Sequence, residues 1–287
     1  MTTPHLPLDA CDCHVHVVGD PDRYPMVPDR HYTPGSASVQ DLKRYMDSLG
    51  LTRAVIVQPS VYGTDNTCML DGLRELNGAG RGVAVLADDA PEGLLRELHA
   101  AGVRGLRLNL ESSGSRDTQR MRESLQSWAR RLAPLGWHMQ VYASVDVIAE
   151  VVAMLPSLPV PVVLDHFAGI PAATALTDSR VQAVLEVVAS GSAYVKLSAP
   201  YRIDLPGNAA SAVAALAAAF VAANPDRMLW ASDWPHTNRE PGKSPLEVSA
   251  SRQIGSSVLA QGIDTWLAGE AIRTRVLVEN PARLYGF

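Results

Sequence analysis

Eight short apolar runs recur along the chain, and segments with the features of helices lie between them. Each run has the length of a β-strand and is rich in Val, Leu and Ile. The runs span residues 8–15, 53–59, 81–87, 102–110, 137–143, 160–167, 193–199 and 227–234. Strand and helix alternating eight times predict a single (β/α)8 TIM barrel of the α/β class. A doubly wound open sheet is the alternative fold, which is weakened because no Gly-rich phosphate loop follows the first run.

The segments between the runs carry helix start and stop signals. Residues 38–50 open on Ser and close on Gly, and residues 90–102 have Pro in the first turn and Gly at the end. Residues 117–136 and 177–191 follow the same plan. No low-complexity linker divides the chain, and 287 residues suit one barrel of roughly 250 residues. We therefore expect residues 1–287 to form one domain.

The composition argues against several classes of partner. The net charge is −5 and there is no long basic run, so nucleic acid is not expected to bind. No apolar run approaches the roughly 20 residues that cross a membrane, and the first residues lack the features of a signal peptide. Three cysteines are too few for a disulfide framework, which favours a cytoplasmic location. A homo-oligomer is compatible with all of this.

Polar side chains gather where the predicted strands end. In TIM barrels the active site lies at the C-terminal ends of the strands. The polar residues that end or closely follow the runs are His14, His16, Ser60, Arg107, Tyr142, His166, Arg202, Asp233 and His236. A closed barrel would bring them to one face, which indicates a site with chemistry rather than a structural role.

Strand alternation predicts how the first run faces. Side chains two residues apart share one face of a strand. Asp12, His14 and His16 would therefore point into the barrel, while Cys11 and Cys13 would face the helices as buried, inert thiols. A metal or redox site built from both Cys and His would need both faces of the strand, so the pattern does not favour one.

Several motifs resemble those of the amidohydrolase superfamily. That superfamily places HxH after the first strand, a His on a later strand and an Asp after the last. The stretches "DCHVHVVGDPDRYP", "QPSVYGTDN", "LDHFAG" and "ASDWPH" occur in order and are similar to its 2-pyrone-4,6-dicarboxylate lactonase-like branch. The resemblance covers nearly the whole chain. It implies a (β/α)8 barrel that opens cyclic esters of sugar acids or of acids from aromatic compound degradation.

The resemblance also implies roles for individual residues. Asp233 would activate water, and three histidines would polarise the lactone carbonyl: His14, His16 and His166. Substrate carboxylates and the groups around them would be bound by Arg107, Arg202, Ser60, Tyr142, Tyr32 and His236. Two of these have a structural alternative, since Tyr32 could serve loop packing and Arg107 an ion pair facing the helices.

One departure from the family pattern bears on substrate choice. The resembled lactonases carry a further Arg shortly after the fourth strand, and here that place falls at residues 112–114, with Arg116 slightly displaced. If Arg116 cannot reach the site, the substrate would be a different acidic lactone.

The sequence favours a reaction without a metal but leaves one divalent ion, Zn or Mn, as the alternative. Its ligands would be His14, His16, His166 and Asp233. Arg107 occupies the place where binuclear members carry a bridging Lys or Glu, and a guanidinium has no lone pair to give. The fifth run ends in Tyr142 where metal-binding relatives commonly supply a His, and His138 lies lower in the core.

Three other functions remain open at this stage. A metal-dependent decarboxylase of the same superfamily uses the same HxH, His and Asp. A sugar-acid lactone isomerase of this branch would move the acyl group between hydroxyls. A small-molecule binding barrel without catalysis is the non-enzyme alternative.

Overall fold

The structure, a computed structural model, describes residues 6–110, 117–203 and 210–287. Eight parallel strands pair in chain order: β1 (Cys11–Val15), β3 (Arg53–Val57), β4 (Gly80–Ala84), β5 (Val103–Asn109), β6 (His138–Tyr142), β7 (Val162–Leu164), β8 (Ala193–Ser198) and β9 (Met228–Ala231). The ring closes just beyond β1 and β9, where His16 N donates to Trp234 O (2.8 Å) and Asp233 N donates to His14 O (3.0 Å). The predicted barrel is confirmed, and the open sheet is wrong.

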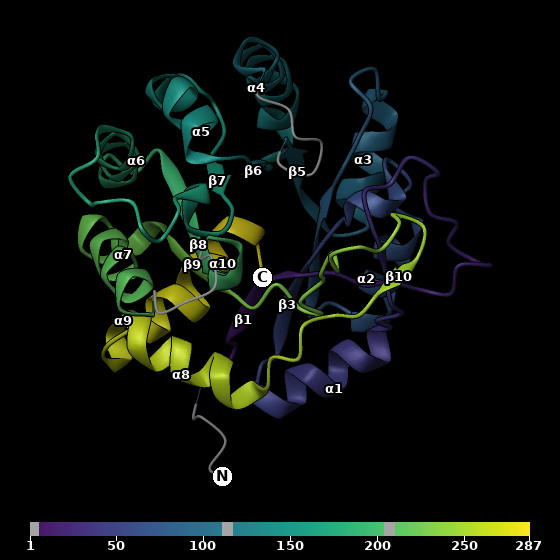
Figure 1. Ribbon diagram of the computed structural model, residues 1–287. Helices are drawn as coiled ribbons and strands as arrows, with labels where there is room; N and C mark the ends of the chain where they lie inside the picture. The colour runs from purple at the N-terminus through teal and green to yellow at the C-terminus, as the bar shows by residue number, and fades with distance from the viewer. Residues whose placement is uncertain (1–5, 111–116, 204–209) are drawn as a thin grey trace.

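Helices surround the ring of strands, except for the last, α10, which lies within the ring in this view (Figure 1). They are α1 (Val39–Leu49), α2 (Thr67–Leu76), α3 (Glu92–Ala100), α4 (Thr118–Leu132), α5 (Val145–Val151), α6 (Ser179–Ala189), α7 (Ala210–Ala223), α8 (Ser256–Trp266), α9 (Glu270–Thr274) and α10 (Asn280–Tyr285). The helices expected from residues 38–50, 90–102, 117–136 and 177–191 are α1, α3, α4 and α6. Within the described ranges, none of the helices is both long enough and apolar enough to cross a bilayer.

The predicted facing of the first strand is wrong in part. Cys11 and Cys13 are buried in a cluster with Val55 and Tyr285, which fills the barrel interior, and they do not face the helices. Asp12 points outward instead, where the Tyr45 hydroxyl of α1 donates to its carboxylate (2.9 Å). Burial raises the pKa of the Cys11 thiol well above its usual value, which supports an inert role.

A β-bulge in β1 explains the difference. Asp12 pairs with Ala54, but Val15 pairs with Ile56, so three steps along β1 match two along β3. The extra residue reverses the alternation, because two consecutive residues then oppose one on the partner strand. His14 therefore faces the interior although Cys13 does so too.

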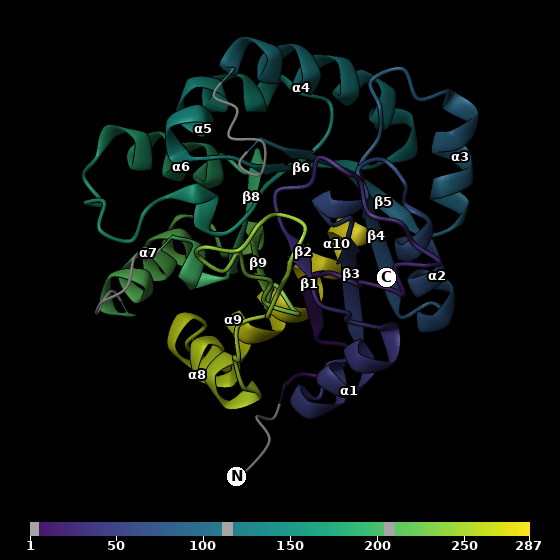
Figure 2. The same cartoon turned by 45° about the vertical axis from the view of Figure 1, so that its right-hand side comes forward.

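Two loops are tied together near the C-terminal ends of the strands. β2 (Thr33–Pro34) follows β1, and it pairs in parallel with β10 (Val248–Ser249), which follows β9. Figure 2 shows the two segments side by side in front of the strands. This pairing fixes the loops that form the entrance to the barrel.

Candidate functional site

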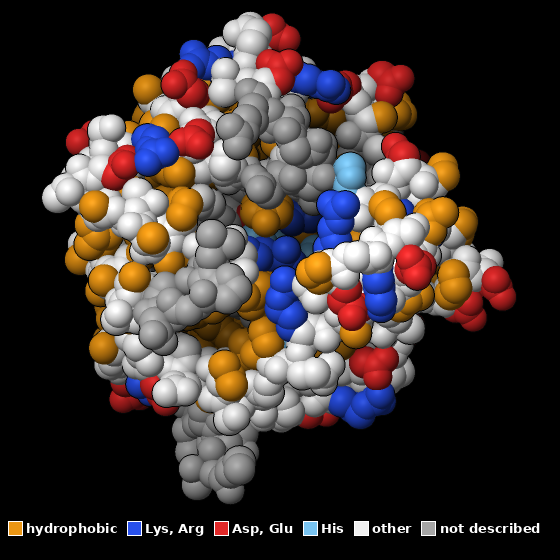
Figure 3. Space-filling model, viewed as in Figure 1, with side chains coloured by type: hydrophobic (Ala, Val, Ile, Leu, Met, Phe, Trp, Pro, Cys, Tyr) orange, Lys and Arg blue, Asp and Glu red, His pale blue; other side chains and the backbone are white. Residues whose placement is uncertain are grey.

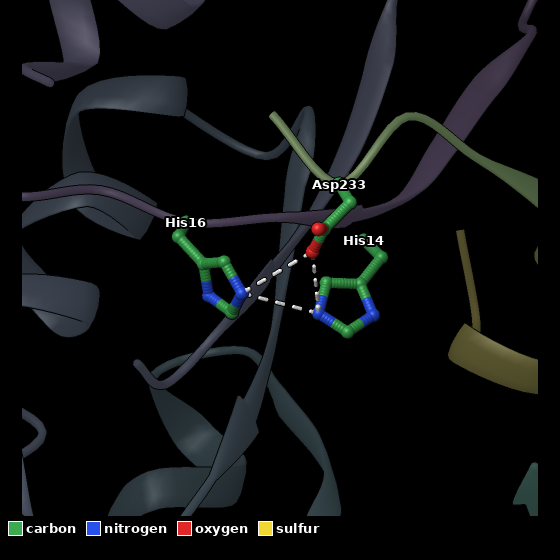
Figure 4. A group of neighbouring side chains, drawn as sticks. All are labelled: His14, His16 and Asp233. Atoms are coloured by element: carbon green, nitrogen blue, oxygen red, sulfur yellow. Dashed lines mark hydrogen bonds and ion pairs between the residues drawn. The ribbon is translucent and has the colours of Figure 1, made fainter. Parts of the chain in front are cut away.

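Three histidines and one aspartate converge at the C-terminal end of the barrel. The Nε2 atoms of His14, His16 and His166 lie 3.7, 3.6 and 3.9 Å from Asp233 Oδ1. His14 belongs to β1 and the others follow β1, β7 and β9. Figure 4 shows His14 and His16 pointing toward the Asp233 carboxylate. The structure thus brings together the four residues predicted to be catalytic.

The backbone is strained at two of these residues. His166 has φ 47° and Asp233 has φ 64°, which is the left-handed region that L-residues rarely adopt. Such strain costs about 1–3 kcal/mol per residue and clusters at functional positions. Here the strained backbone occurs at the two residues whose side chains turn into the site.

The two oxygens of Asp233 have different surroundings. Oδ2 accepts from Arg202 Nε (2.7 Å) and Tyr201 Oη (2.8 Å), and it lies 2.6 Å from Arg202 Nη2. Oδ1 has no hydrogen-bond partner among the described residues. Burial raises the pKa of Asp233, but the positive charge of Arg202 and the nearby His166 lower it by more. The pKa of Asp233 therefore lies well below its usual value. Asp233 is therefore an ionised carboxylate with one oxygen available to accept a proton.

Two of the histidines are held neutral at neutral pH. Burial, followed by the charge of Lys196, holds the pKa of His14 well below its usual value. Burial lowers the pKa of His166 to about 3, and its Nδ1 lies 2.8 Å from Ser198 Oγ. Neutral imidazoles can each donate one N–H bond or offer one lone pair. They can therefore bind a carbonyl oxygen without adding net charge.

A buried polar network lies beneath the histidines. Lys196 Nζ on β8 donates to Gln140 Oε1 (2.6 Å) and lies 3.3 Å from His14 Nδ1 and 3.4 Å from Asp165 Oδ1. Gln140 Nε2 donates to Asp165 Oδ2 (2.9 Å). Burial raises the pKa of Asp165, but Lys196 and His14 lower it more, so it lies well below its usual value. Sequence analysis missed this network, although a Lys inside the apolar run "AYVKLSA" is a visible signal.

A cavity of about 280 Å³ adjoins the cluster at His16, which is one of the residues that line it. Four arginines are among the residues that line it: Arg107, Arg202, Arg239 and Arg252. Figure 3 shows Lys and Arg side chains around the central hollow of this face. Guanidinium groups bind carboxylates and other planar anions through paired hydrogen bonds. The cavity therefore suits a small anion, although the chain as a whole is acidic.

Arg107 lies inside the barrel and not against the helices, so its predicted structural alternative is wrong. Its Nη2 lies 3.6 Å from Asp165 Oδ2, its Nη1 donates to Gln58 O (3.4 Å), and its guanidinium stands over the Tyr142 ring at 5.7 Å. Both polar contacts are long, so the guanidinium keeps hydrogen-bonding capacity for a ligand in the cavity.

The other predicted binding residues fall into three cases. Ser60, Tyr32 and Tyr142 line the cavity. His236 is buried with its ring near Tyr45 and Tyr201, at centroid distances of 6.5 and 6.4 Å, and is not among the described residues that line the cavity. Arg116 lies outside the described residues.

Comparison with known families agrees with this geometry. The sequence model of one family, described as Amidohydrolase, matches residues 11–287. The chain belongs to the amidohydrolase family. The match spans all eight strands and all four residues of the cluster.

Three related amidohydrolase-like proteins are informative. A 2-pyrone-4,6-dicarboxylate hydrolase of Comamonas testosteroni is 33% identical, over 98% of this chain and 91% of its own length. A 4-sulfomuconolactone hydrolase of Rhizobium radiobacter is 28% identical, over 98% and 91%. The solved structure of a candidate 2-pyrone-4,6-dicarboxylic acid hydrolase from Pseudomonas putida is 27% identical, covers 98% of each chain and has a TM-score of 0.82.

The donor atoms in this amidohydrolase site also fit a divalent cation. The ligand atoms of His14, His16 and Asp233 lie within 4.8 Å of one another, as do those of His14, Asp165 and His166. Imidazole nitrogen and carboxylate oxygen are common zinc ligands, and Asp233 Oδ1 is unpaired in the described structure. The residues present are therefore potential metal ligands.

Proposed function

We propose that this amidohydrolase hydrolyses a small acidic lactone, with 2-pyrone-4,6-dicarboxylate as the first candidate substrate. The observation that carries the proposal is the ionised Asp233 carboxylate, whose Oδ1 has no hydrogen-bond partner among the described residues and lies 3.6 Å from His16 Nε2, because His16 lines a cavity together with four arginines. The relatives support it, because the two hydrolases in that comparison are named for lactones that carry anionic groups.

Asp233 acts as the general base. Its Oδ1 takes a proton from water, and the hydroxide attacks the lactone carbonyl carbon to give a tetrahedral oxyanion. The ester C–O bond then breaks, and the proton on Asp233 passes to the departing ring oxygen. The product is the open-chain acid, and Asp233 returns to its ionised form.

The histidines stabilise the oxyanion. A neutral imidazole N–H that points at the developing charge replaces the water that would solvate it in bulk. Removing one such donor costs about 10²–10³ in kcat in well-studied hydrolases. This role is supported by the Nε2 atoms of His14, His16 and His166, which lie 3.7, 3.6 and 3.9 Å from the Asp233 oxygen proposed to accept the proton of water.

The arginines bind the acidic groups of the substrate. With a net charge of −5, the protein cannot attract a dianion over long range, so local positive charge must do so. Arg202 uses Nε and Nη2 on Asp233 Oδ2, whereas the polar contacts of Arg107 with Gln58 and Asp165 are long, at 3.4 and 3.6 Å. Arg107 is therefore the residue best placed to exchange its present partners for a substrate carboxylate.

We propose that the reaction proceeds without a metal. A divalent cation held by His14, His16, His166 and Asp233 would polarise the lactone carbonyl as a Lewis acid. Three cationic side chains border this position. Lys196 lies beside His14, Arg202 forms an ion pair with Asp233, and Arg107 lies beside Asp165. They disfavour a further two positive charges there.

The function is tested by pH-stat assay of the purified protein on a panel of lactones. The panel contains 2-pyrone-4,6-dicarboxylate, a sugar-acid lactone and a neutral lactone of the same ring size. We expect base uptake with the acidic lactones and little with the neutral one. Hydrolysis of the neutral lactone alone, or isomerisation without net acid release, would contradict the proposal.

Removal of metal ions gives a separate prediction. After dialysis against EDTA and then dipicolinate, we expect kcat to stay within about twofold of the untreated protein. The dialysed protein is analysed for residual zinc and manganese, so that the result applies to metal-free enzyme. Activity that disappears and returns with Zn²⁺ or Mn²⁺ would rule out the metal-free reaction and favour a metal-dependent decarboxylase or hydrolase.

A further inference from the structure

We propose that Lys196 is a positioning residue that holds His14 in the tautomer with its proton on Nε2. This rests on the proposed function, in which His14 donates to the lactone carbonyl oxygen. Lys196 is fully buried and is not among the described residues that line the cavity. Its Nζ contacts His14 Nδ1 (3.3 Å), and it acts on the substrate through this histidine.

The contacts on one side of the His14 ring favour this tautomer. An ammonium group has three protons and no lone pair. Lys196 Nζ faces three acceptors, Gln140 Oε1 at 2.6 Å, His14 Nδ1 at 3.3 Å and Asp165 Oδ1 at 3.4 Å. If Lys196 donates a hydrogen bond to Nδ1, that nitrogen must offer its lone pair. In a neutral imidazole the proton then lies on Nε2.

Asp165 is the competing partner of the same nitrogen. Its Oδ1 lies 3.3 Å from His14 Nδ1, and a hydrogen bond between them would require the opposite tautomer. Asp165 Oδ1, however, has no hydrogen-bond partner among the described residues, whereas the Lys196–His14 contact meets hydrogen-bond geometry. Lys196 Nζ lies 3.4 Å from the same Asp165 oxygen, so the ammonium competes with the His14 ring for this carboxylate.

The contacts on the other side of the ring agree. His14 Nε2 and His16 Nε2 lie 3.2 Å apart, so one of them must carry the proton that joins them. His16 Nδ1 lies 2.7 Å from Val57 O, which can only accept, so Nδ1 carries the proton when the His16 ring holds one. Its Nε2 then offers a lone pair, and His14 Nε2 supplies the proton.

The tautomer decides what His14 can do. With the proton on Nε2, His14 can transfer its hydrogen bond from His16 Nε2 to the reacting carbonyl oxygen, as the proposed oxyanion stabilisation requires. With the proton on Nδ1, it would present a lone pair, which repels a carbonyl oxygen and suits a metal ion instead. Lys196 thus favours the hydrogen-bond donor role of His14 over the metal-ligand role that the same ring could also support.

The tautomer is measured directly by long-range ¹H–¹⁵N NMR on protein labelled with ¹⁵N-histidine, with His14 assigned from the His14→Asn spectrum. We expect the Nε2–H pattern in the wild type and in Asp165→Asn. In Lys196→Met we expect the Nδ1–H pattern, because Asp165 is then the remaining partner. An Nδ1–H signal in the wild type, or no change in Lys196→Met, overturns the proposal.

Kinetics on the lactone give the second readout. Lys196→Met should lower kcat at least about tenfold, a smaller loss than the roughly 10²–10³ for removing an oxyanion donor outright, while KM stays within about threefold. Lys43→Met is the matched control and should keep full activity. An unchanged kcat in folded Lys196→Met overturns the positioning role.

The design keeps the two proposals apart. If circular dichroism shows that Lys196→Met does not fold, the NMR spectra of the wild type and of Asp165→Asn are sufficient to decide the tautomer. If the wild type hydrolyses no acidic lactone, the proposed function fails, while the NMR result still confirms or overturns the action of Lys196 on His14.

Discussion

Asp233→Asn is expected to lower kcat for lactone hydrolysis by two or more powers of ten while the barrel stays folded. An amide cannot take the proton from water, so the reaction loses its general base. Two powers of ten correspond to about 3 kcal/mol in the barrier. The change is isosteric, and it keeps an acceptor oxygen for Arg202 and Tyr201, which now bind Oδ2.

The measurement is kcat and KM by pH-stat, with circular dichroism to check the fold. Asp146→Asn is the matched control, because Asp146 is an exposed carboxylate on α5 whose partner is Arg180. It should keep activity within about twofold. Near-normal turnover in folded Asp233→Asn would remove Asp233 from the role of base.

The strands of this fold are predictable because a parallel barrel strand is buried on both faces. Such a strand appears in the sequence as a short continuous apolar run, and residues 53–59 contain β3. Helix ends are equally local. Ser38 caps α1 by accepting from Asp41 N, and Gly50 takes a φ of 75° at the other end.

The direction of side chains in the first strand is not predictable in this way. Alternation holds only for a regular strand, and the bulge between Asp12 and Val15 is defined by pairing with β3, some 40 residues away. The four-residue cluster was still found, because HxH places two histidines near the strand end whichever way the cysteines face.

Half of the cavity arginines were also missed for a physical reason. Arg239 and Arg252 lie in the long connection after β9, where no periodicity relates sequence position to direction. Their approach to the cavity depends on the pairing of β10 with β2. Arg107 and Arg202 were found because a strand and a strand end define where they point.

Arg107→Ala is expected to lower kcat/KM for a dicarboxylate lactone at least tenfold. A substrate carboxylate that loses its guanidinium partner in a largely buried site costs about 2–5 kcal/mol. Arg107 is 6% exposed and lines the cavity, so water cannot fully replace it. Arg202→Ala should also lose activity, but its loss includes the unpairing of Asp233 and does not isolate substrate binding.

The two half-esters of the dicarboxylate separate these effects, because each has lost one charge. One half-ester lacks the carboxylate bound by Arg107, and for it Arg107→Ala should lower kcat/KM by little more than about twofold. For the other half-ester, kcat/KM should fall as much as it does for the diacid. The substitution also weakens the environment of Asp165, but that cost is the same for every substrate. The measurement is kcat/KM for the diacid and both half-esters in wild type and Arg107→Ala. Equal losses on all three would show that Arg107 supports the barrel without binding a carboxylate.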